Sequence, residues 1–331
     1  MTHQIRVSAR DIEFGCEDGE TLLDAAERAG YSLPYSCRKG VCSSCEGGLI
    51  AGEAAQRGRG GITGPRSGVL FCQTRPRSDL EIAPKRIEAS APPTRKTIGA
   101  FVFRLSRPTP DVTMLHLRYP PQDRVRFRAG QYLQVLLEDG TRRNYSMAGP
   151  PQETDGTMLH VRRIDGGRFS EGMLAGLAPG SRLTIELPYG EFTLRDEDTR
   201  PAILLASGTG MAPVTSIVED LIRRGIDRPL DVYWGVRREA DLYLGALPER
   251  WRARLPRLRY VPVLSRPDPG WTGRAGRVQG AVLEDHGDLS GHVVYACGNA
   301  AMVASAREAL VTERGLDEQA FHADAFVPSG G

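Results

Sequence analysis

The chain has 331 residues, of which 40% are hydrophobic and 25% charged, which is the composition of an ordinary globular protein. At about 100–200 residues per domain, this length predicts two or three domains. The net charge of +2 is too small to indicate binding to nucleic acid or to an anionic membrane. No apolar stretch approaches the roughly 20 residues of a membrane span, and the first residues lack the apolar core of a signal peptide. We therefore expect a soluble, cytoplasmic protein.

The chain begins with short strands and one helix. Ile5–Val7 and Ile12–Phe14 alternate in polarity and predict a hairpin. The pattern from Glu20 to Gly30 predicts a helix, because Thr21 and Asp24 resemble a capping pair and glycine is a common helix stop. The glycine-rich stretch from residue 47 to 68 has little periodicity, and we expect it to be mostly loop.

Clustered cysteines are the most informative feature of this first segment. The chain contains Cys16, Cys37, Cys42, Cys45, Cys72 and Cys297. Three of them follow the spacing C-x4-C-x2-C and a fourth comes after 26 more residues, which is the plant-type [2Fe–2S] pattern. A structural zinc site is the alternative, but such sites usually contain two C-x2-C pairs and this segment has only one. We therefore predict that Cys37, Cys42, Cys45 and Cys72 bind the iron, and that Cys16 is a small core residue.

The cysteine loop also resembles a known family. The run from Tyr35 to Cys45 is similar to the cluster loop of plant-type ferredoxins, which implies a β-grasp fold for residues 1–88. Photosynthetic ferredoxins are strongly acidic, whereas residues 1–90 contain 12 basic and 12 acidic groups, so a photosynthetic partner is not expected. Pro84 to Thr97 has three prolines and no hydrophobic period, and residues 89–97 are predicted to be a linker.

Short strands separated by turns dominate the middle of the chain. Their spacing predicts a small antiparallel barrel or sandwich over residues 98–197. The candidate strands are Ala100–Leu105, Val112–Leu117, Tyr132–Leu137, Met158–Arg163 and Arg182–Leu187.

From residue 198 to 331 the pattern alternates between apolar strands and helices, and this predicts a doubly wound parallel sheet. The candidate strands are Ala202–Ala206, Leu230–Val236, Leu258–Leu264 and His292–Ala296, and the candidate helices are Val214–Arg224 and Ala300–Arg314. The chain is therefore expected to be multidomain, with α+β and α/β parts.

Two motifs in the barrel segment point to a flavin. The run from Arg143 to Ser146 is similar to the R-x-Y-S motif of the ferredoxin–NADP reductase superfamily, in which a tyrosine stacks on the flavin and an arginine binds its phosphate. The family's next strand and Gly-Ser turn have counterparts here, so the resemblance implies an FAD site. Its candidate residues are Arg143, Asn144, Tyr145, Ser146, His160, Val161, Arg162, Gly167, Arg168, Phe169 and Ser170.

The α/β segment contains the matching nicotinamide signals. The turn Gly208-Thr209-Gly210 lies between a strand and a helix, which suits phosphate binding, and it looks like the family's G-T-G-x-x-P turn. Cys297-Gly298 resembles the family's turn beside the nicotinamide, and Phe326 resembles its terminal aromatic near the flavin. Together with Tyr145 and Ser146, residues Thr209, Cys297 and Phe326 are the candidates for contact with the reacting rings.

The type of nicotinamide is predicted from weaker signals. Arg237 and Arg266 follow predicted strands and could contact a ribose or its 2′-phosphate. The arrangement of the three segments resembles that of oxygenase reductases, which often use NADH, so the resemblance implies NADH, with NADPH as the alternative.

Taken whole, the chain resembles the reductase components of bacterial oxygenase systems, and within them the terephthalate-type reductases of Rieske-type aromatic ring-hydroxylating dioxygenases. The resemblance implies electron flow from NAD(P)H through FAD and [2Fe–2S] to a terminal oxygenase. Similar reductases serve deoxysugar dehydrases and diiron monooxygenases, and the motifs do not distinguish these acceptors. A non-catalytic iron–sulfur redox sensor is the alternative from another class, and the flavin and nicotinamide motifs disfavour it.

Overall fold

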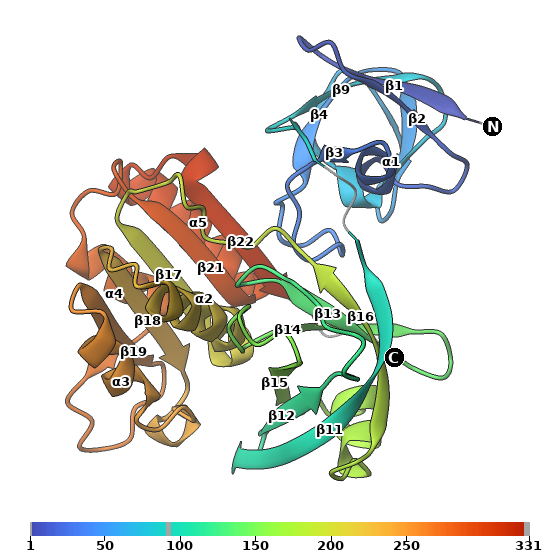
Figure 1. Cartoon of the computed structure of the whole chain (residues 1–331). Coiled ribbons are helices and arrows are strands. Elements are labelled where there is room, and N and C mark those ends of the chain that lie inside the picture. Colours follow the sequence, from blue (N-terminus) through green and yellow to red (C-terminus); the bar gives the residue numbers. More distant parts are fainter. Residues whose placement is uncertain (1, 91–93, 328–331) are drawn as a thin grey trace. The chain divides into compact units, whose positions relative to one another are not determined.

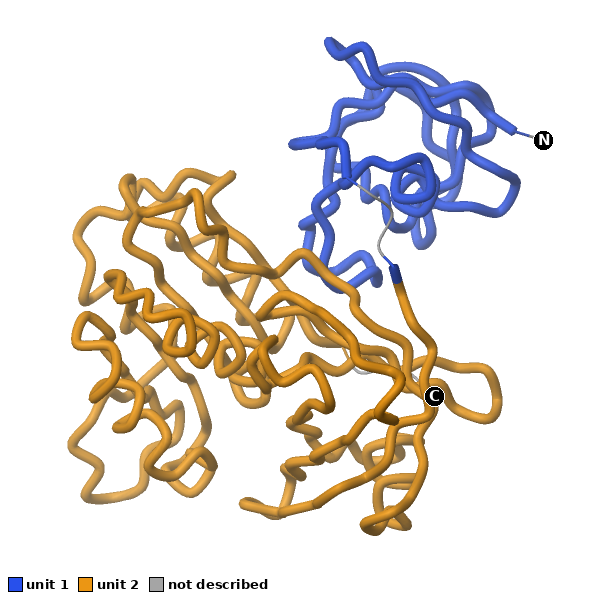
Figure 2. Tube along the Cα trace, viewed as in Figure 1, with its two compact units in different colours: residues 1–94 blue, residues 95–331 orange. Residues whose placement is uncertain are grey.

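A computed structural model describes residues 2–90 and 94–327 of the chain. The chain forms two compact units, residues 1–94 and residues 95–331 (Figure 2). In the described parts of the chain, no helix combines the length and apolarity needed to cross a membrane.

The first unit is built on a five-stranded mixed sheet with strand order β2-β1-β9-β4-β7, crossed by one helix, and smaller sheets β10-β3 and β6-β5-β8 complete it (Figure 1). The predicted hairpin is confirmed as the antiparallel pair β1 and β2. The elements are β1 (His3–Val7), β2 (Glu13–Cys16), α1 (Leu22–Arg28), β3 (Tyr31–Ser32), β4 (Glu46–Ala51), β5 (Glu53–Gln56), β6 (Gly60–Thr63), β7 (Arg66–Leu70), the 3-10 helix η1 (Phe71–Gln73), β8 (Thr74–Pro76), β9 (Leu80–Pro84) and β10 (Glu88–Ala89).

Helix α1 forms for the reasons that the sequence suggests. The Thr21 side chain caps it by accepting a hydrogen bond from the Asp24 amide at 3.2 Å. Leu22 and Leu23 are buried in the core, and the chain turns away at Gly30, where φ is +84°. Cys16 is fully buried in the same core, as expected.

The prediction of a loop over residues 47–68 was wrong, because strands β4 to β7 occupy most of this stretch. Its glycines serve close packing as well as turns. A Cβ at Gly47 would lie 2.5 Å from the Phe71 ring, so a strand with a side chain there could not pack. The prediction failed because it interpreted these glycines only as turn residues, whereas some of them lie within strands, where close packing can require a glycine, as at Gly47.

The predicted linker contains more regular structure than expected. Strand β10 (Glu88–Ala89) includes its first residue, and β11 (Lys96–Thr109) begins inside it. The break between the compact units falls after Thr94. Pro92 and Pro93, on which the prediction partly rested, lie outside the described residues.

The first part of the second unit is a six-stranded antiparallel sheet with strand order β14-β13-β16-β11-β12-β15. A bridge between Met147 and Leu159 joins the segments at its two edges, so the sheet closes like a barrel, as predicted. Its other elements are β12 (Val112–Arg118), β13 (Tyr132–Leu136), β14 (Arg142–Ser146), β15 (Gly156–Arg162), the π-helix η2 (Arg168–Met173) and β16 (Arg182–Tyr189).

The remainder is an all-parallel sheet with strand order β20-β19-β18-β17-β21-β22, and this confirms the predicted doubly wound arrangement. Helices α2 and α3 contact each other, and so do α4 and α5. The elements are β17 (Ala202–Ser207), the 3-10 helix η3 (Gly208–Gly210), α2 (Met211–Arg224), β18 (Leu230–Val236), the 3-10 helix η4 (Glu239–Asp241), α3 (Leu247–Arg254), β19 (Leu258–Leu264), β20 (Arg274–Ala275), α4 (Val278–Asp285), β21 (Val293–Asn299), α5 (Ala300–Arg314), the 3-10 helix η5 (Glu318–Ala320) and β22 (Phe321–Phe326). Helices α3 and α4 and strand β22 were not predicted.

Candidate functional site

The four predicted iron ligands lie together in the first unit. Cys37, Cys42 and Cys45 come from the loop before β4, Cys72 comes from η1, and each is at most 6% exposed. The loop bends sharply, with positive φ at Arg38, Gly40 and Ser43. Such a bend directs three side chains of one short segment to the same place.

The four sulfurs form two pairs. The hydrogen bond between Cys37 and Cys42 lowers the pKa of Cys37 to about 5 and raises the pKa of Cys42. Sγ of Cys45 donates to Sγ of Cys72 at 3.2 Å, which lowers the pKa of Cys72 and raises that of Cys45.

This pairing fits a binuclear cluster better than one metal ion. Two thiol pairs offer two sulfurs to each of two irons, which is the ligand count of a [2Fe–2S] cluster held by four cysteines. The donor set therefore fits the cluster rather than the zinc alternative.

Groups around the sulfurs hold the loop in place. The Arg38 side chain forms ion pairs with Asp24 and Glu27 of α1 and lies over the Tyr35 ring, with 4.4 Å from its Cζ atom to the centroid. The side-chain amide of Gln73 donates to the backbone carbonyl oxygens of Arg38 at 2.9 Å and Cys72 at 2.8 Å. Gln73 thus ties the cysteine loop to the turn that contains the fourth cysteine.

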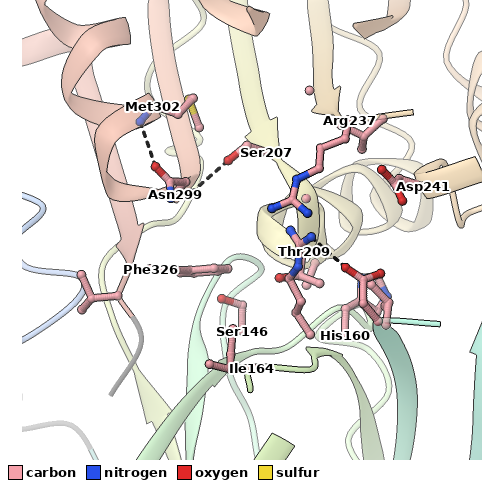
Figure 3. Close-up of a pocket in the computed structure, with 18 of the residues that line it drawn as sticks. Ser146, His160, Ile164, Ser207, Thr209, Arg237, Asp241, Asn299, Met302 and Phe326 are labelled. Carbon is pink, nitrogen blue, oxygen red and sulfur yellow. Dashed lines mark hydrogen bonds and ion pairs between the residues drawn. The ribbon is translucent and has the colours of Figure 1, made fainter. Parts of the chain in front are cut away.

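The second unit contains a cavity of about 700 Å³ between the barrel and the parallel sheet. It lies where β17, β18 and β21 end (Figure 3). Strand β17 has β18 on one side and β21 on the other, so the cavity lies at the topological switch point of the sheet, where open α/β sheets bind ligands.

Most of the predicted flavin and nicotinamide residues line this cavity. The predicted residues that line it are Arg143, Asn144, Tyr145, Ser146, His160, Arg162, Gly167, Arg168, Phe169, Ser170, Gly208, Thr209, Arg237 and Phe326. Val161, Gly210, Arg266, Cys297 and Gly298 do not line it. The individual roles predicted for all of these residues remain predictions.

Two buried polar atoms in the cavity wall lack partners. Among the described residues, neither Oγ of Ser146 nor Nε2 of His160 has a hydrogen-bond partner, although the two side chains come from residues only 6% and 4% exposed. Buried polar groups are rarely left unpaired, so this wall is built to meet a polar ligand. Burial also lowers the pKa of His160 to about 3, so its ring is neutral.

The aromatic and cationic groups beside them suit a flavin nucleotide. The Tyr145 ring packs against Phe169, with 5.1 Å between the ring centroids, and burial raises the pKa of its phenol. Within the described residues, the Arg143 side chain hydrogen-bonds only to the neighbouring backbone carbonyl of Arg142, so its charge is available for a phosphate. The Ser170 hydroxyl accepts from the Ile164 amide at 3.1 Å and therefore also fixes the turn before η2.

The glycine-rich turn after β17 is held from two sides. The Trp234 indole donates to the Gly208 carbonyl at 2.9 Å. A Cβ at Gly210 would lie 2.3 Å from the Cys297 carbonyl oxygen, so this glycine is required by the close approach of β21. Gly210 does not line the cavity itself, but it allows the turn to pack closely against β21 and so positions the cavity wall.

Cys297 lies deeper than its predicted contact with the nicotinamide would suggest. It is fully buried at the end of β21, with its Sγ 4.0 Å from a carboxylate oxygen of Asp324, and burial raises its pKa well above the ordinary value. The thiol is therefore neutral in this structure.

Sequence reasoning missed several cavity residues. The phenol oxygen of Tyr243 lies 3.0 Å from Nδ1 of His160, and Asp111 forms a 2.7 Å ion pair with Arg162. The Asn299 side chain caps α5, and its backbone amide donates to the Ser207 hydroxyl at 2.9 Å. Asn299 and Met302 both line the cavity, and Figure 3 shows Phe326 between Asn299 and Ser146. No motif marks Tyr243 or Asp111, since their partners are distant in sequence.

Comparisons with known proteins match this division of the chain. Residues 5–77 match the family model of the 2Fe-2S iron-sulfur cluster binding domain. Residues 103–194 match the oxidoreductase FAD-binding domain, and residues 204–308 match the oxidoreductase NAD-binding domain. The fold and the sites therefore define an NAD(P)H-dependent flavin and iron–sulfur oxidoreductase.

Whole-chain relatives narrow the class. Reductase component 1 of terephthalate 1,2-dioxygenase from Comamonas sp is 41% identical over 99% of this chain and 98% of the relative. The CDP-6-deoxy-L-threo-D-glycero-4-hexulose-3-dehydrase reductase of Yersinia pseudotuberculosis is 36% identical, over 99% and 100%. The crystal structure of the Amycolatopsis reductase GcoB superimposes with a TM-score of 0.79 and 31% identity, covering 99% of this chain and 100% of that one.

The chain therefore belongs to the family of reductase components that join an N-terminal [2Fe–2S] ferredoxin domain to FAD- and NAD-binding domains. It is an oxidoreductase, and the interpretation as a non-catalytic redox sensor is set aside.

Proposed function

We propose that this reductase passes electrons from NADH, through FAD and the [2Fe–2S] cluster, to the Rieske-type terminal oxygenase of a terephthalate-type aromatic ring-hydroxylating dioxygenase. The observation that carries the proposal is the 41% identity, over nearly the whole of both chains, to terephthalate 1,2-dioxygenase reductase components.

The chain's own residues divide the task of holding the cofactors. When bound, FAD would supply the conversion of a two-electron hydride into single electrons, and the cluster would supply one-electron transfer. Tyr145 offers an aromatic face to the ring system, and Ser146 and His160 offer the polar atoms that have no partner in the described part of the chain. Arg143 supplies the cation for the phosphate. No side chain has to act as a nucleophile.

The other wall of the cavity, formed by the parallel-sheet part of the unit, would hold the nicotinamide cofactor. The turn from Gly208 to Gly210 follows β17 and gives the backbone a close approach to a pyrophosphate. Arg237 and Asp241 both line the cavity beyond β18, where a ribose is expected to lie. A carboxylate there can accept from a ribose hydroxyl and would repel a 2′-phosphate, which supports the choice of NADH.

Reconstitution with purified acceptors tests the function. The loaded reductase is mixed with NADH, a terephthalate-type oxygenase and its aromatic substrate, and product formation is measured against a parallel reaction that contains a deoxysugar dehydrase. We expect coupled product only with the oxygenase. Turnover by the dehydrase alone would favour the second candidate, to which the 36% identity with dehydrase reductases points.

The coenzyme assignment has its own test. We expect kcat/KM for NADH to exceed kcat/KM for NADPH. The variant Asp241→Asn should bring these two values closer together. A wild-type preference for NADPH would contradict the assignment, whatever the acceptor proves to be.

A further inference from the structure

The first unit is neutral overall but strongly polarised. Residues 53–77 contain five arginines and a single acidic residue, Glu53, so this segment has a net charge of +4. The rest of the unit contains 7 basic and 11 acidic groups, a net charge of −4. The equal totals of the whole unit therefore conceal a basic side.

The five arginines of this segment are called the arginine face. Its members are Arg57, Arg59, Arg66, Arg75 and Arg77. All five are exposed. Among the described residues none forms an ion pair, whereas Arg28 and Arg38 of the same unit are both paired with glutamates. The face thus presents uncompensated positive charge to the solvent.

Backbone geometry places four of these arginines in or beside the small sheet β6-β5-β8, and the fifth, Arg66, begins β7 of the larger sheet. Ala54, Gln56 and Ile62 of the sheet β6-β5-β8 are buried, so the alternate residues Ala55, Gly61 and Arg75 face outwards. Arg75 is directly opposite Ala55, which is opposite Gly61.

Arg77 extends over the same outer face. A Cβ built on Gly61 would lie 3.7 Å from Nη1 of Arg77. Because Ala55 and Gly61 beneath these two arginine side chains are small, a partner has room to approach the charges.

Hydrogen bonds to backbone carbonyls hold two of these side chains. Nε of Arg75 donates to the Gly19 carbonyl at 2.8 Å, and Nη1 of Arg59 donates to the Gly68 carbonyl at 3.1 Å. Carbonyl acceptors fix a guanidinium without neutralising it, so the positive charge is both ordered and available.

The arginine face adjoins the cluster. The Arg57 amide donates to the Gln73 carbonyl at 3.0 Å, and Gln73 directly follows the iron ligand Cys72. Arg75 is only three residues from the same cysteine. Val41 in the cysteine loop is 38% exposed, so an apolar contact is available on the loop as well. A protein bound here would be close to the sulfur ligands.

We propose that the arginine face is the docking surface for an acidic patch on the protein that receives electrons from the cluster. The inference rests on the proposed function, because it needs an external acceptor. The second unit of this chain is a poor fit as the occupant, since residues 95–331 contain 31 basic and 29 acidic groups and share the positive sign. Opposite charge brings partners together faster and orients them, which suits a transient electron-transfer complex.

The experiment uses one haem acceptor with two surface charges. Native cytochrome c is basic, and succinylation of its lysines makes it acidic. At low ionic strength, we expect the loaded reductase to reduce succinylated cytochrome c at least about fivefold faster than the native protein, and salt to remove the difference.

The triple variant Arg57→Gln, Arg75→Gln and Arg77→Gln should lose most of the preference for the succinylated acceptor. The control, Arg250→Gln, Arg252→Gln and Arg254→Gln, removes the same charge from exposed positions in α3 and should keep the preference. Flavin content and the cluster spectrum verify that both variants are folded. If the triple variant proves unstable, Arg57→Gln with Arg59→Gln leaves the outer face of the strands intact and should halve the preference or more.

The proposal is overturned if the folded triple variant reduces succinylated cytochrome c at the wild-type rate with the same salt dependence. It is also overturned if anaerobic rapid mixing shows that the variant slows reduction of the cluster by the flavin, since the face would then serve the second unit. Failure to support a dioxygenase would instead count against the proposed acceptor and leave the cytochrome result standing.

Discussion

Removing the hydroxyl of Tyr243 is expected to weaken both the second unit and its hold on flavin. The phenol oxygen lies 3.0 Å from Nδ1 of His160, and both side chains are buried. In Tyr243→Phe the ring and its T-shaped contact with Trp234 remain, so the change removes the hydrogen bond without opening a large cavity. His160 would then have neither ring nitrogen paired within the protein, because its Nε2 has no partner among the described residues.

The size of the effect follows from that loss. A buried polar group left without its partner costs about 1–3 kcal/mol. For a unit of about 150–250 residues, each kcal/mol shifts Tm by roughly 2–4 °C. We therefore expect Tyr243→Phe to lower Tm by about 2–12 °C, and flavin to be released more readily because the His160 ring is no longer held in one orientation.

Thermal release of flavin, followed by its fluorescence, measures both effects in one assay. Tyr260→Phe is the matched control, since Tyr260 is partly buried in β19 and its hydroxyl forms no hydrogen bond within the described residues. The control should shift Tm by less than about 1 °C, as expected when no buried partner is lost. If Tyr243→Phe behaves like the control, the hydrogen bond contributes nothing and the reasoning is refuted.

Three other predictions concern the two sites. Cys42→Ser should lose the cluster and cytochrome c reduction but keep ferricyanide reduction from the flavin; unchanged cytochrome c activity would overturn the order of electron flow. Tyr145→Ala should loosen flavin by tenfold or more, and full retention after gel filtration would show that the ring system stacks elsewhere. The last concerns pH: because the native state keeps His160 neutral down to about pH 3 whereas its ordinary pKa is 6.5, the unfolded chain gains a proton first as the pH falls. The stability due to the neutral ring is present above pH 6.5 and is lost towards pH 3, by about 1.4 kcal/mol per pH unit. Between pH 7 and pH 5, the free energy of unfolding measured with urea should therefore fall by about 2 kcal/mol less in His160→Gln than in the wild type. Equal falls in the two proteins would contradict the burial argument.

Local chemistry is what the sequence determined by itself. The cysteine spacing identified the ligands because three of them belong to one loop, whose bend is encoded by Gly40 and its neighbours. Helix ends were predictable for the same reason, since Thr21 caps α1 and Gly225 ends α2 through contacts within a few residues. The alternation of strands and helices likewise gave the parallel sheet, because a right-handed crossover leaves few arrangements.

The tertiary structure decided whatever depends on partners far apart in the chain. Tyr243 meets His160 across 83 residues, and the Gln73 amide reaches the Arg38 carbonyl across 35. Gly47 looks like a loop residue until the Phe71 ring is placed against it. Periodicity and motifs describe neighbours along the chain, whereas a cavity wall and a packed glycine are defined by neighbours in space. For that reason most of the residues that the sequence named line the cavity, but only the fold revealed the other lining residues and which polar atoms are left to meet a ligand.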